Sequence, residues 1–161
     1  MNKSNTATLK LAHPQLYRES LSNFSQYGFQ HGDGWYALVT ELSQAIATAA
    51  ANAGIPTASE DYPVAVQAKE KFGLLRFYVG NSTPEIEAII AVYQNKSSEI
   101  CEDCGAPGTL FRVGTWRVMC AGCDAEYLKR FKPITTEMIT KISGLRDLDD
   151  NKNKAKDEDL H

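Results

Sequence analysis

Residues 101–123 read Cys-Glu-Asp-Cys-Gly-Ala-Pro-Gly-Thr-Leu-Phe-Arg-Val-Gly-Thr-Trp-Arg-Val-Met-Cys-Ala-Gly-Cys and decide the fold. The stretch holds every cysteine of the chain, in two C-x2-C pairs that are separated by fifteen residues. This spacing is typical of a zinc site, in which each pair curls two sulfurs onto one ion. We therefore predict one structural Zn²⁺ per chain, bound by Cys101, Cys104, Cys120 and Cys123.

The residues between the two pairs predict a small β-hairpin. Segments 110–113 and 116–119 are apolar and β-prone, and Gly114-Thr115 lies between them as a turn. The expected unit is a C-x2-C turn (a knuckle), then a hairpin, then a second knuckle. A site closed by four thiolates leaves no open position for catalysis, and the three histidines, His13, His31 and His161, fall outside the spacing. We expect the metal to hold the fold.

Three other interpretations of the cysteines stay open. They are a pair of disulfides, a thioredoxin-like dithiol, and an open metal site in which water replaces one cysteine. Zinc is preferred because residues 1–8 lack the apolar stretch of a signal peptide, which argues against an oxidising compartment. A redox dithiol also leaves the second cysteine pair without a role.

Working outward, residues 64–79 predict a second hairpin. Residues 64–69 alternate with period two, and so do residues 74–79, with a turn at Gly73 between them. The expected buried face consists of Val64, Val66, Ala68, Leu75, Phe77 and Val79. A two-stranded hairpin needs helices packed on it to be stable.

Five helices are expected around these hairpins. The first runs from Pro14 to about Gly28, and the second is capped by Asp33 and ends near Gly54. The third begins with a capping box formed by Ser82 and Glu85 and ends near residue 96. Two more are expected at residues 124–130 and 135–145.

These elements define an α+β fold class, with helices packed on a β-hairpin and a four-cysteine zinc ribbon inserted near the C-terminus. Residues 1–12 are predicted to be a disordered N-terminus, and residues 13–98 a helical and β-hairpin domain. Residues 99–146 comprise the zinc ribbon with its following helices. Residues 147–161 form a charged tail that is predicted to be disordered.

Hydropathy and charge limit the classes of partner that we expect. No run of about 18 apolar residues is present, so we expect a cytoplasmic protein that does not bind membranes. The tail carries the whole net charge of -3, because it holds six acidic residues and three lysines. The acidic and basic residues of the rest of the chain are equal in number. A neutral body is a poor match for non-specific binding to nucleic acid, although Arg112 and Arg117 cluster in the ribbon.

His31 and Asp33 invite an acid–base interpretation. The preferred interpretation is a loop histidine and a helix N-cap, because capping explains Asp33 and no third catalytic partner is evident. Trp35 is expected in the core. Whether the chain is an enzyme is therefore uncertain, and a binding protein is preferred.

Three segments together resemble a group of small, uncharacterised bacteriophage and prophage zinc-ribbon proteins. They are Gly-Asp-Gly-Trp at 32–35, Lys-Glu-Lys-Phe-Gly-Leu-Leu-Arg-Phe-Tyr at 69–78, and Cys-Glu-Asp-Cys-Gly-Ala-Pro-Gly at 101–108. The likeness covers roughly residues 30–125, and Leu74 stands where the group is expected to have glycine. It implies a phage origin, with the host cytoplasm as location, and brings no activity with it.

Our first functional hypothesis is a non-enzymatic phage accessory protein that binds a host or phage protein, in one version to counter a host defence system. The alternative is a transcriptional regulator that binds nucleic acid through the ribbon, and the third is an enzyme whose site forms only in three dimensions. A homo-oligomer stays open. The predicted partner surface consists of Phe72, Arg76, Tyr78, Arg112 and Arg117, because arginine and aromatic side chains are common interface anchors. The alternative that Phe72 and Tyr78 pack under the long helix or the ribbon stays open.

Overall fold

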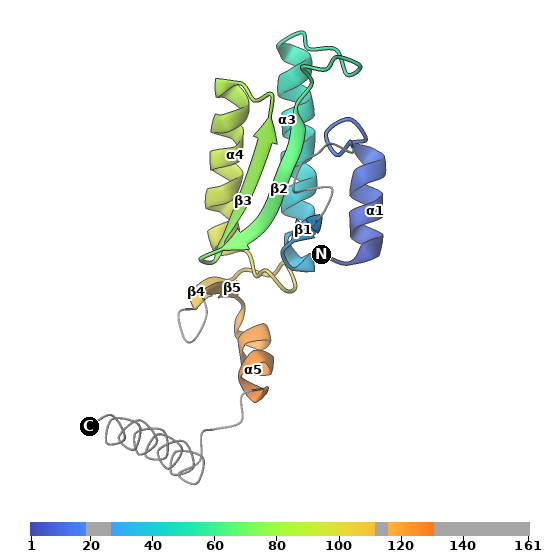
Figure 1. Cartoon of the computed structure of the whole chain (residues 1–161). Coiled ribbons are helices and arrows are strands. Elements are labelled where there is room, and N and C mark those ends of the chain that lie inside the picture. Colours follow the sequence, from blue (N-terminus) through green and yellow to red (C-terminus); the bar gives the residue numbers. More distant parts are fainter. Residues whose placement is uncertain (19–26, 112–115, 131–161) are drawn as a thin grey trace, which may run out of the picture. The chain divides into compact units, whose positions relative to one another are not determined.

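The computed structural model describes residues 1–18, 27–111 and 116–130 (Figure 1). The chain divides into two compact units, Met1–Ala125 and Glu126–His161. The first unit holds both hairpins and the four cysteines. The described part of the second is residues 126–130, so the predicted helix at 135–145 and the predicted tail lie outside the described residues.

A three-stranded sheet forms the middle of the first unit. Strands β2 (Val64–Lys71) and β3 (Leu74–Gly80) are antiparallel, as the alternating pattern predicts, and turn at Phe72 and Gly73. A third strand, β1 (Phe29–Gln30), pairs in parallel with β2 at Ala68 and Lys69. The two residues of β1 are too few to show a period in the sequence, and the prediction missed this strand.

The predicted buried face is right for β3 and partly wrong for β2. Leu75 and Phe77 are buried, and Val79 packs against the core. On β2 the buried residues are Ala65 and Ala68, in place of the predicted Val64 and Val66. The register shifts between Ala65 and Gln67. A bulge adds one residue to the strand, which moves the residues before it to the other face.

Three helices supply the core that covers this sheet: α1 (Lys3–Ala12), α3 (Tyr36–Asn52) and α4 (Pro84–Lys96). Figure 1 shows α3 behind the hairpin, with α4 and α1 on either side of it. Short 3₁₀ turns, η1 (Asp33–Trp35) and η2 (Ser97–Glu99), precede α3 and follow α4. The largest fully buried side chains of this core are Trp35, Phe77, Leu9, Leu16, Leu42, Ile46, Leu75 and Ile86.

Helix α1 corrects the prediction that residues 1–12 are disordered. The side chain of Asn2 caps the helix by accepting a 2.8 Å hydrogen bond from the Asn5 N–H. Leu9 is 1% exposed and joins the core, and the Met1 amine donates to the His31 carbonyl oxygen. The segment is polar apart from Leu9 and its close neighbours, so its order depends on tertiary contacts that local composition does not reveal.

The predicted helix from Pro14 to Gly28 is corrected at its start. Residues 14–17 form turns, residues 19–26 lie outside the described part, and Tyr27 is helical directly before Gly28, where the predicted helix ends. Leu16 and Tyr17 are nevertheless buried, and the Tyr17 hydroxyl shares a 2.6 Å hydrogen bond with Ser43 of α3. Leu16 and Tyr17 thus pack against the core from a turn.

Helix α4 is confirmed, with a different cap. The Thr83 hydroxyl oxygen accepts a 3.2 Å hydrogen bond from the Ile86 N–H, so the N-cap is Thr83 and the predicted Ser82 stands one residue too early. Ile86 and Ile90 are buried, and the helix ends at Lys96 as expected. In the part of the chain that the structure describes, no helix combines the length and apolar character needed to cross a membrane.

Candidate metal centre

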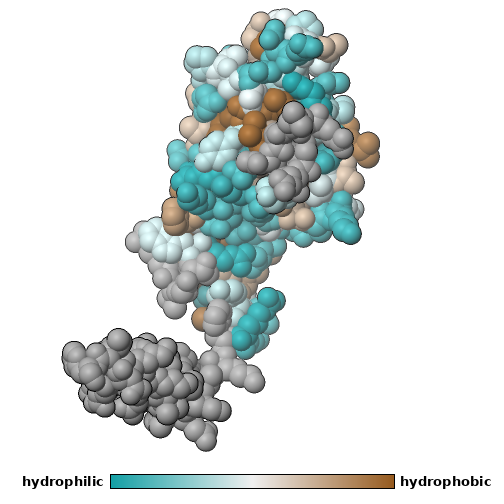
Figure 2. All heavy atoms as spheres, in the orientation of Figure 1, coloured by the Kyte–Doolittle hydropathy of each residue, from teal (hydrophilic) through white to brown (hydrophobic). Residues whose placement is uncertain are grey.

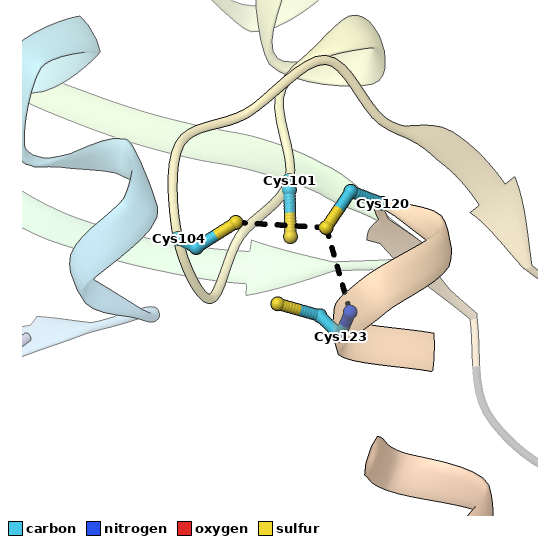
Figure 3. A group of neighbouring side chains, drawn as sticks. All are labelled: Cys101, Cys104, Cys120 and Cys123. Carbon is cyan, nitrogen blue, oxygen red and sulfur yellow. Dashed lines mark hydrogen bonds between the residues drawn. The ribbon is translucent and has the colours of Figure 1, made fainter. Parts of the chain in front are cut away.

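The four cysteine side chains converge on one point (Figure 3). Their sulfur atoms all lie within 4.8 Å of one another, and none is in a disulfide. The Sγ atoms of Cys104 and Cys120 are 3.6 Å apart. Four sulfurs held about 2.3 Å from a zinc ion at the corners of a tetrahedron are about 3.8 Å from each other. The four cysteines could therefore hold a metal ion, as the spacing predicts.

Local backbone geometry shapes the first knuckle. The Cys101 N–H donates to the Ala106 carbonyl oxygen at 2.8 Å, and the Gly105 N–H donates to the Cys101 carbonyl oxygen at 2.9 Å. Gly105 has φ +80°, a left-handed conformation that glycine adopts without strain. The turn therefore reverses the chain between Cys101 and Cys104 and aims both side chains to the same side.

A small hairpin carries the chain to the second knuckle. Strands β4 (Thr109–Phe111) and β5 (Arg117–Met119) are antiparallel, and helix α5 (Ala121–Lys129) begins directly after Cys120. The Cys123 N–H donates to the Cys120 sulfur at 3.4 Å. The knuckle, hairpin, knuckle order is confirmed for the described residues, which exclude the turn at 112–115. Helix α5 starts at Ala121, before the predicted Asp124, because the second C-x2-C turn forms its first residues.

The pKa values of the Cys120 and Cys123 thiols are shifted in opposite directions. The Cys123 N–H, with help from the Cys104 side chain, lowers the pKa of Cys120 to about 7. The neighbouring side chains of Cys104 and Cys120 raise the pKa of Cys123. Like charges this close oppose one another, so all four thiolates require a cation among them. The donor set and its electrostatics fit a divalent metal.

The first knuckle rests directly on the loop before α3. The Gly34 N–H donates to the Glu102 carbonyl oxygen at 2.8 Å. A Cβ on Gly34 would lie 2.1 Å from the Cys101 carbonyl oxygen and 2.7 Å from the Cys104 nitrogen. The indole Nε1 of Trp35 donates to the Ile100 carbonyl oxygen at 2.9 Å. Residues 32–35 therefore support the first C-x2-C turn, which gives Gly32 and Gly34 a role that the sequence analysis did not find.

Glu102, in the first C-x2-C turn, contacts both the loop before α3 and the β4–β5 hairpin. It is 5% exposed. Its Oε1 accepts a 2.9 Å hydrogen bond from the Gly32 N–H, and its Oε2 accepts a 3.1 Å bond from Arg117 Nε. Arg117 also pairs with Asp103 at 2.6 Å. Sequence reasoning missed Glu102. The available signal was the pair of acids inside a C-x2-C turn, with an arginine in the following hairpin.

These contacts change the interpretation of the predicted ribbon arginines. Arg117 is held by two carboxylates, and its side chain is 23% exposed. Arg112 lies outside the described residues. The remaining members of the predicted partner surface are on the hairpin, where Phe72 is 59% and Tyr78 47% exposed. Arg76 lies 3.4 Å from the Gln94 side chain of α4.

His31 and Asp33 have structural positions. His31 is 6% exposed, beside the rings of Phe29 and Trp35, and its Nδ1–H donates to the Gly32 carbonyl oxygen at 2.9 Å. Burial lowers the pKa of His31 to about 4. Trp35 is fully buried, as expected.

Asp33 does not cap α3, which corrects the predicted N-cap. Its Oδ1 accepts from the Asn2 N–H at 2.7 Å and from the Asn5 side chain at 3.2 Å, and the N-cap position of α3 has no side-chain bond. These bonds, the Asn2 N–H first, lower the pKa of Asp33. The 3₁₀ turn η1 takes the place of a capped start, and Asp33 instead fastens the beginning of α1.

In comparisons with protein families, with curated proteins and with solved structures, nothing matches this chain.

Proposed function

We propose that this chain is a non-enzymatic binding protein, stabilised by one zinc ion, that engages a protein partner. The observation that carries the proposal is the position of the cysteine cluster against the Gly32–Trp35 loop. A metal held there joins the C-x2-C knuckle to the start of α3. Its contribution would be folding free energy, since metal binding and folding are linked in such sites.

Zinc is proposed because four thiolates form a closed site that is typical of structural zinc. Cys101, Cys104, Cys120 and Cys123 would hold the ion. Cys101 is fully buried and Cys104 exposed, so one side of the cluster faces the protein and the other faces solvent. Iron also accepts four thiolates, and elemental analysis separates the two metals.

A binding role is preferred over catalysis because the residues considered for acid–base work serve the fold. His31 is buried and bonded to its neighbour, and Asp33 holds α1. The nucleic-acid alternative is weakened by Arg117, whose guanidinium already faces Glu102 and Asp103. We keep the proposed phage setting, a host or phage protein as partner and the host cytoplasm as location, on the strength of the resemblance alone.

The proposal is tested in two steps. Protein purified without added metal should contain one equivalent of zinc, and Cys101→Ser should lose it. Affinity capture from phage-infected cells, with nuclease treatment, should then recover a defined protein with the wild type and lose it with Cys101→Ser. Purified protein with intramolecular disulfides and no metal would refute the metal centre. Recovery that disappears after nuclease treatment would favour the nucleic-acid alternative.

A further inference from the structure

The tip of the β2–β3 hairpin contains an unusual backbone conformation. Phe72 has φ +56° and Gly73 has φ +77°, so both central residues of the turn are left-handed. Turns of this type strongly prefer Asn-Gly, and a bulky residue with positive φ is a true outlier. Gly73 has a packing reason, since a Cβ there would meet Leu110 of β4 at 2.2 Å. Phe72 is a bulky residue held at positive φ, and such strain at a turn is the kind of feature that marks a functional side chain.

That side chain is displayed on the surface as part of an aromatic pair. Phe72 is 59% exposed and packs edge to face on Trp116, which is 45% exposed, with ring centroids 5.9 Å apart. The Nζ of Lys71 lies 5.3 Å from the centre of the Phe72 ring. The main hairpin and the ribbon thus jointly present two large apolar rings beside a cation.

Positive charge continues along the outward side of the hairpin. The cross-strand partners Lys69 and Arg76 lie on the face opposite Leu75 and Phe77, as does Tyr78. Within the described residues, none of Lys69, Lys71 and Arg76 forms an ion pair with a carboxylate. Figure 2 shows hydrophilic residues gathered over the lower part of β2 and β3. This face therefore offers unneutralised cations next to exposed aromatic rings.

We propose that this hairpin face (Lys69, Lys71, Phe72, Arg76, Tyr78 and Trp116) binds a protein segment that carries carboxylates beside an apolar side chain. The apolar group would bury against Phe72 and Trp116, and the carboxylates would meet the lysines and Arg76. Aromatic and arginine side chains at the centre of such a patch are the usual energetic anchors. The inference rests on the proposed function, for which it names the surface and the chemistry of the partner.

The same observations disfavour single-stranded nucleic acid as the occupant. The face offers three cations, Lys69, Lys71 and Arg76. These are few for a phosphate backbone, because the affinity for nucleic acid grows with the number of neutralised phosphates.

The test is a titration of the ¹⁵N-labelled, metal-loaded full chain, followed by amide and indole shifts. The probes are a random copolymer of glutamate and tyrosine, polyglutamate, and a short oligothymidylate. We expect the copolymer to shift the signals of residues 69–78 and the Trp116 indole, polyglutamate to bind several-fold more weakly, and oligothymidylate to leave them unchanged. No shift with the copolymer, shifts confined to another surface, or tighter binding of oligothymidylate would overturn the proposal.

Two variants separate recognition from folding. Phe72→Asn supplies the residue that this turn prefers, so we expect an unchanged or higher melting temperature together with copolymer affinity lowered at least about fivefold. Its control is Val92→Asn on α4, where the side chain is 52% exposed, and affinity should not change. Lys71→Glu should likewise weaken binding, whereas Lys3→Glu should not. Equal affinity in wild type and Phe72→Asn would reject the surface while leaving the metal content and the proposed binding role intact.

Discussion

The N–H of Gly34 donates a hydrogen bond to the carbonyl oxygen of Glu102, and the α-carbon of Gly34 lies against the backbone of the first C-x2-C turn. The loop before α3 and the candidate metal centre are thus joined backbone to backbone. Any side chain at position 34 must displace atoms that cannot rotate away. We therefore expect the stability of the core and the retention of the proposed metal to depend on each other.

Gly34→Ala should therefore destabilise the protein by about 2–4 kcal/mol, with faster loss of metal to a chelator. The new Cβ would lie 2.1 Å from the Cys101 oxygen and 2.5 Å from the Gly105 nitrogen, both backbone atoms. Urea unfolding and a chelator competition assay measure the two effects. Gly122→Ala is the matched control, because its Cβ would meet only the Cys120 sulfur at 4.0 Å and lies in helix α5. The control should be neutral or slightly stabilising, and equal losses in both variants would contradict the close packing at Gly34.

Glu102→Gln should cost about 1–3 kcal/mol of unfolding free energy. It keeps the shape of a buried side chain but removes the charge that faces Arg117 Nε at 3.1 Å, and it weakens the bond from the Gly32 N–H. Asp103→Asn is the control, since Asp103 contacts the same arginine from a side chain that is 39% exposed. Exposed ion pairs contribute little, so this control should lose less than about 1 kcal/mol. Chemical denaturation of both variants at neutral pH measures the difference, and a larger loss for Asp103→Asn would contradict the assignment.

The NMR signal of the Trp35 indole N–H should change when the metal is removed. The indole N–H of this buried residue donates to the Ile100 carbonyl oxygen, directly before the first cysteine. When a chelator releases the ion, we expect the Trp35 indole resonance to shift and its hydrogen exchange to accelerate by about tenfold or more, because the knuckle loses its linkage to metal. The amide of Ser43, further along α3, should keep most of its protection. An unchanged Trp35 signal in metal-free protein would show that the knuckle keeps its structure without the ion.

His31 should make the protein less stable in mild acid. Burial, with a smaller effect of the N-terminal ammonium, holds the pKa of His31 at about 4 against the opposing effects of the hydrogen bond to Gly32 and of Asp33, whereas an unfolded histidine titrates near 6.5. The unfolded chain therefore binds the extra proton first, and stability falls as pH decreases from about 6.5 to about 4, by at most about 3 kcal/mol. Unfolding free energy should be measured across this range for the wild type and His31→Phe. The variant should have the shallower slope, and parallel curves would contradict the buried neutral imidazole.

Local patterns account for the parts of this fold that were predicted, and distant contacts account for the rest. The cysteine spacing and the alternation along β3 are properties of a few neighbouring residues, and both the cluster and the strand are confirmed. Helix α1 is held by Leu9 in the core and by Asp33, and strand β1 exists because β2 lies beside it. Neither helix α1 nor strand β1 can be predicted from its own residues alone.

The candidate site shows the same division. Its four cysteines were found from spacing, while the roles of Glu102, Gly32 and Gly34 depend on contacts between segments about seventy residues apart. The predicted cap at Asp33 failed for the same reason, because its carboxylate is taken by the start of α1. In β2 a bulge broke the period on which the buried face was predicted.

The contact between residues 32–35 and the first C-x2-C turn also implies an order of events during synthesis. Gly32 and Gly34 leave the ribosome long before Glu102, and their N–H groups need the carboxylate and carbonyl oxygens that this residue supplies. The two C-x2-C pairs emerge close together and can capture an ion as a local loop, which closes at little entropic cost. The start of α3 would therefore complete these hydrogen bonds only after the ribbon has folded, and a shortage of the proposed metal would delay the maturation of a core that was translated earlier.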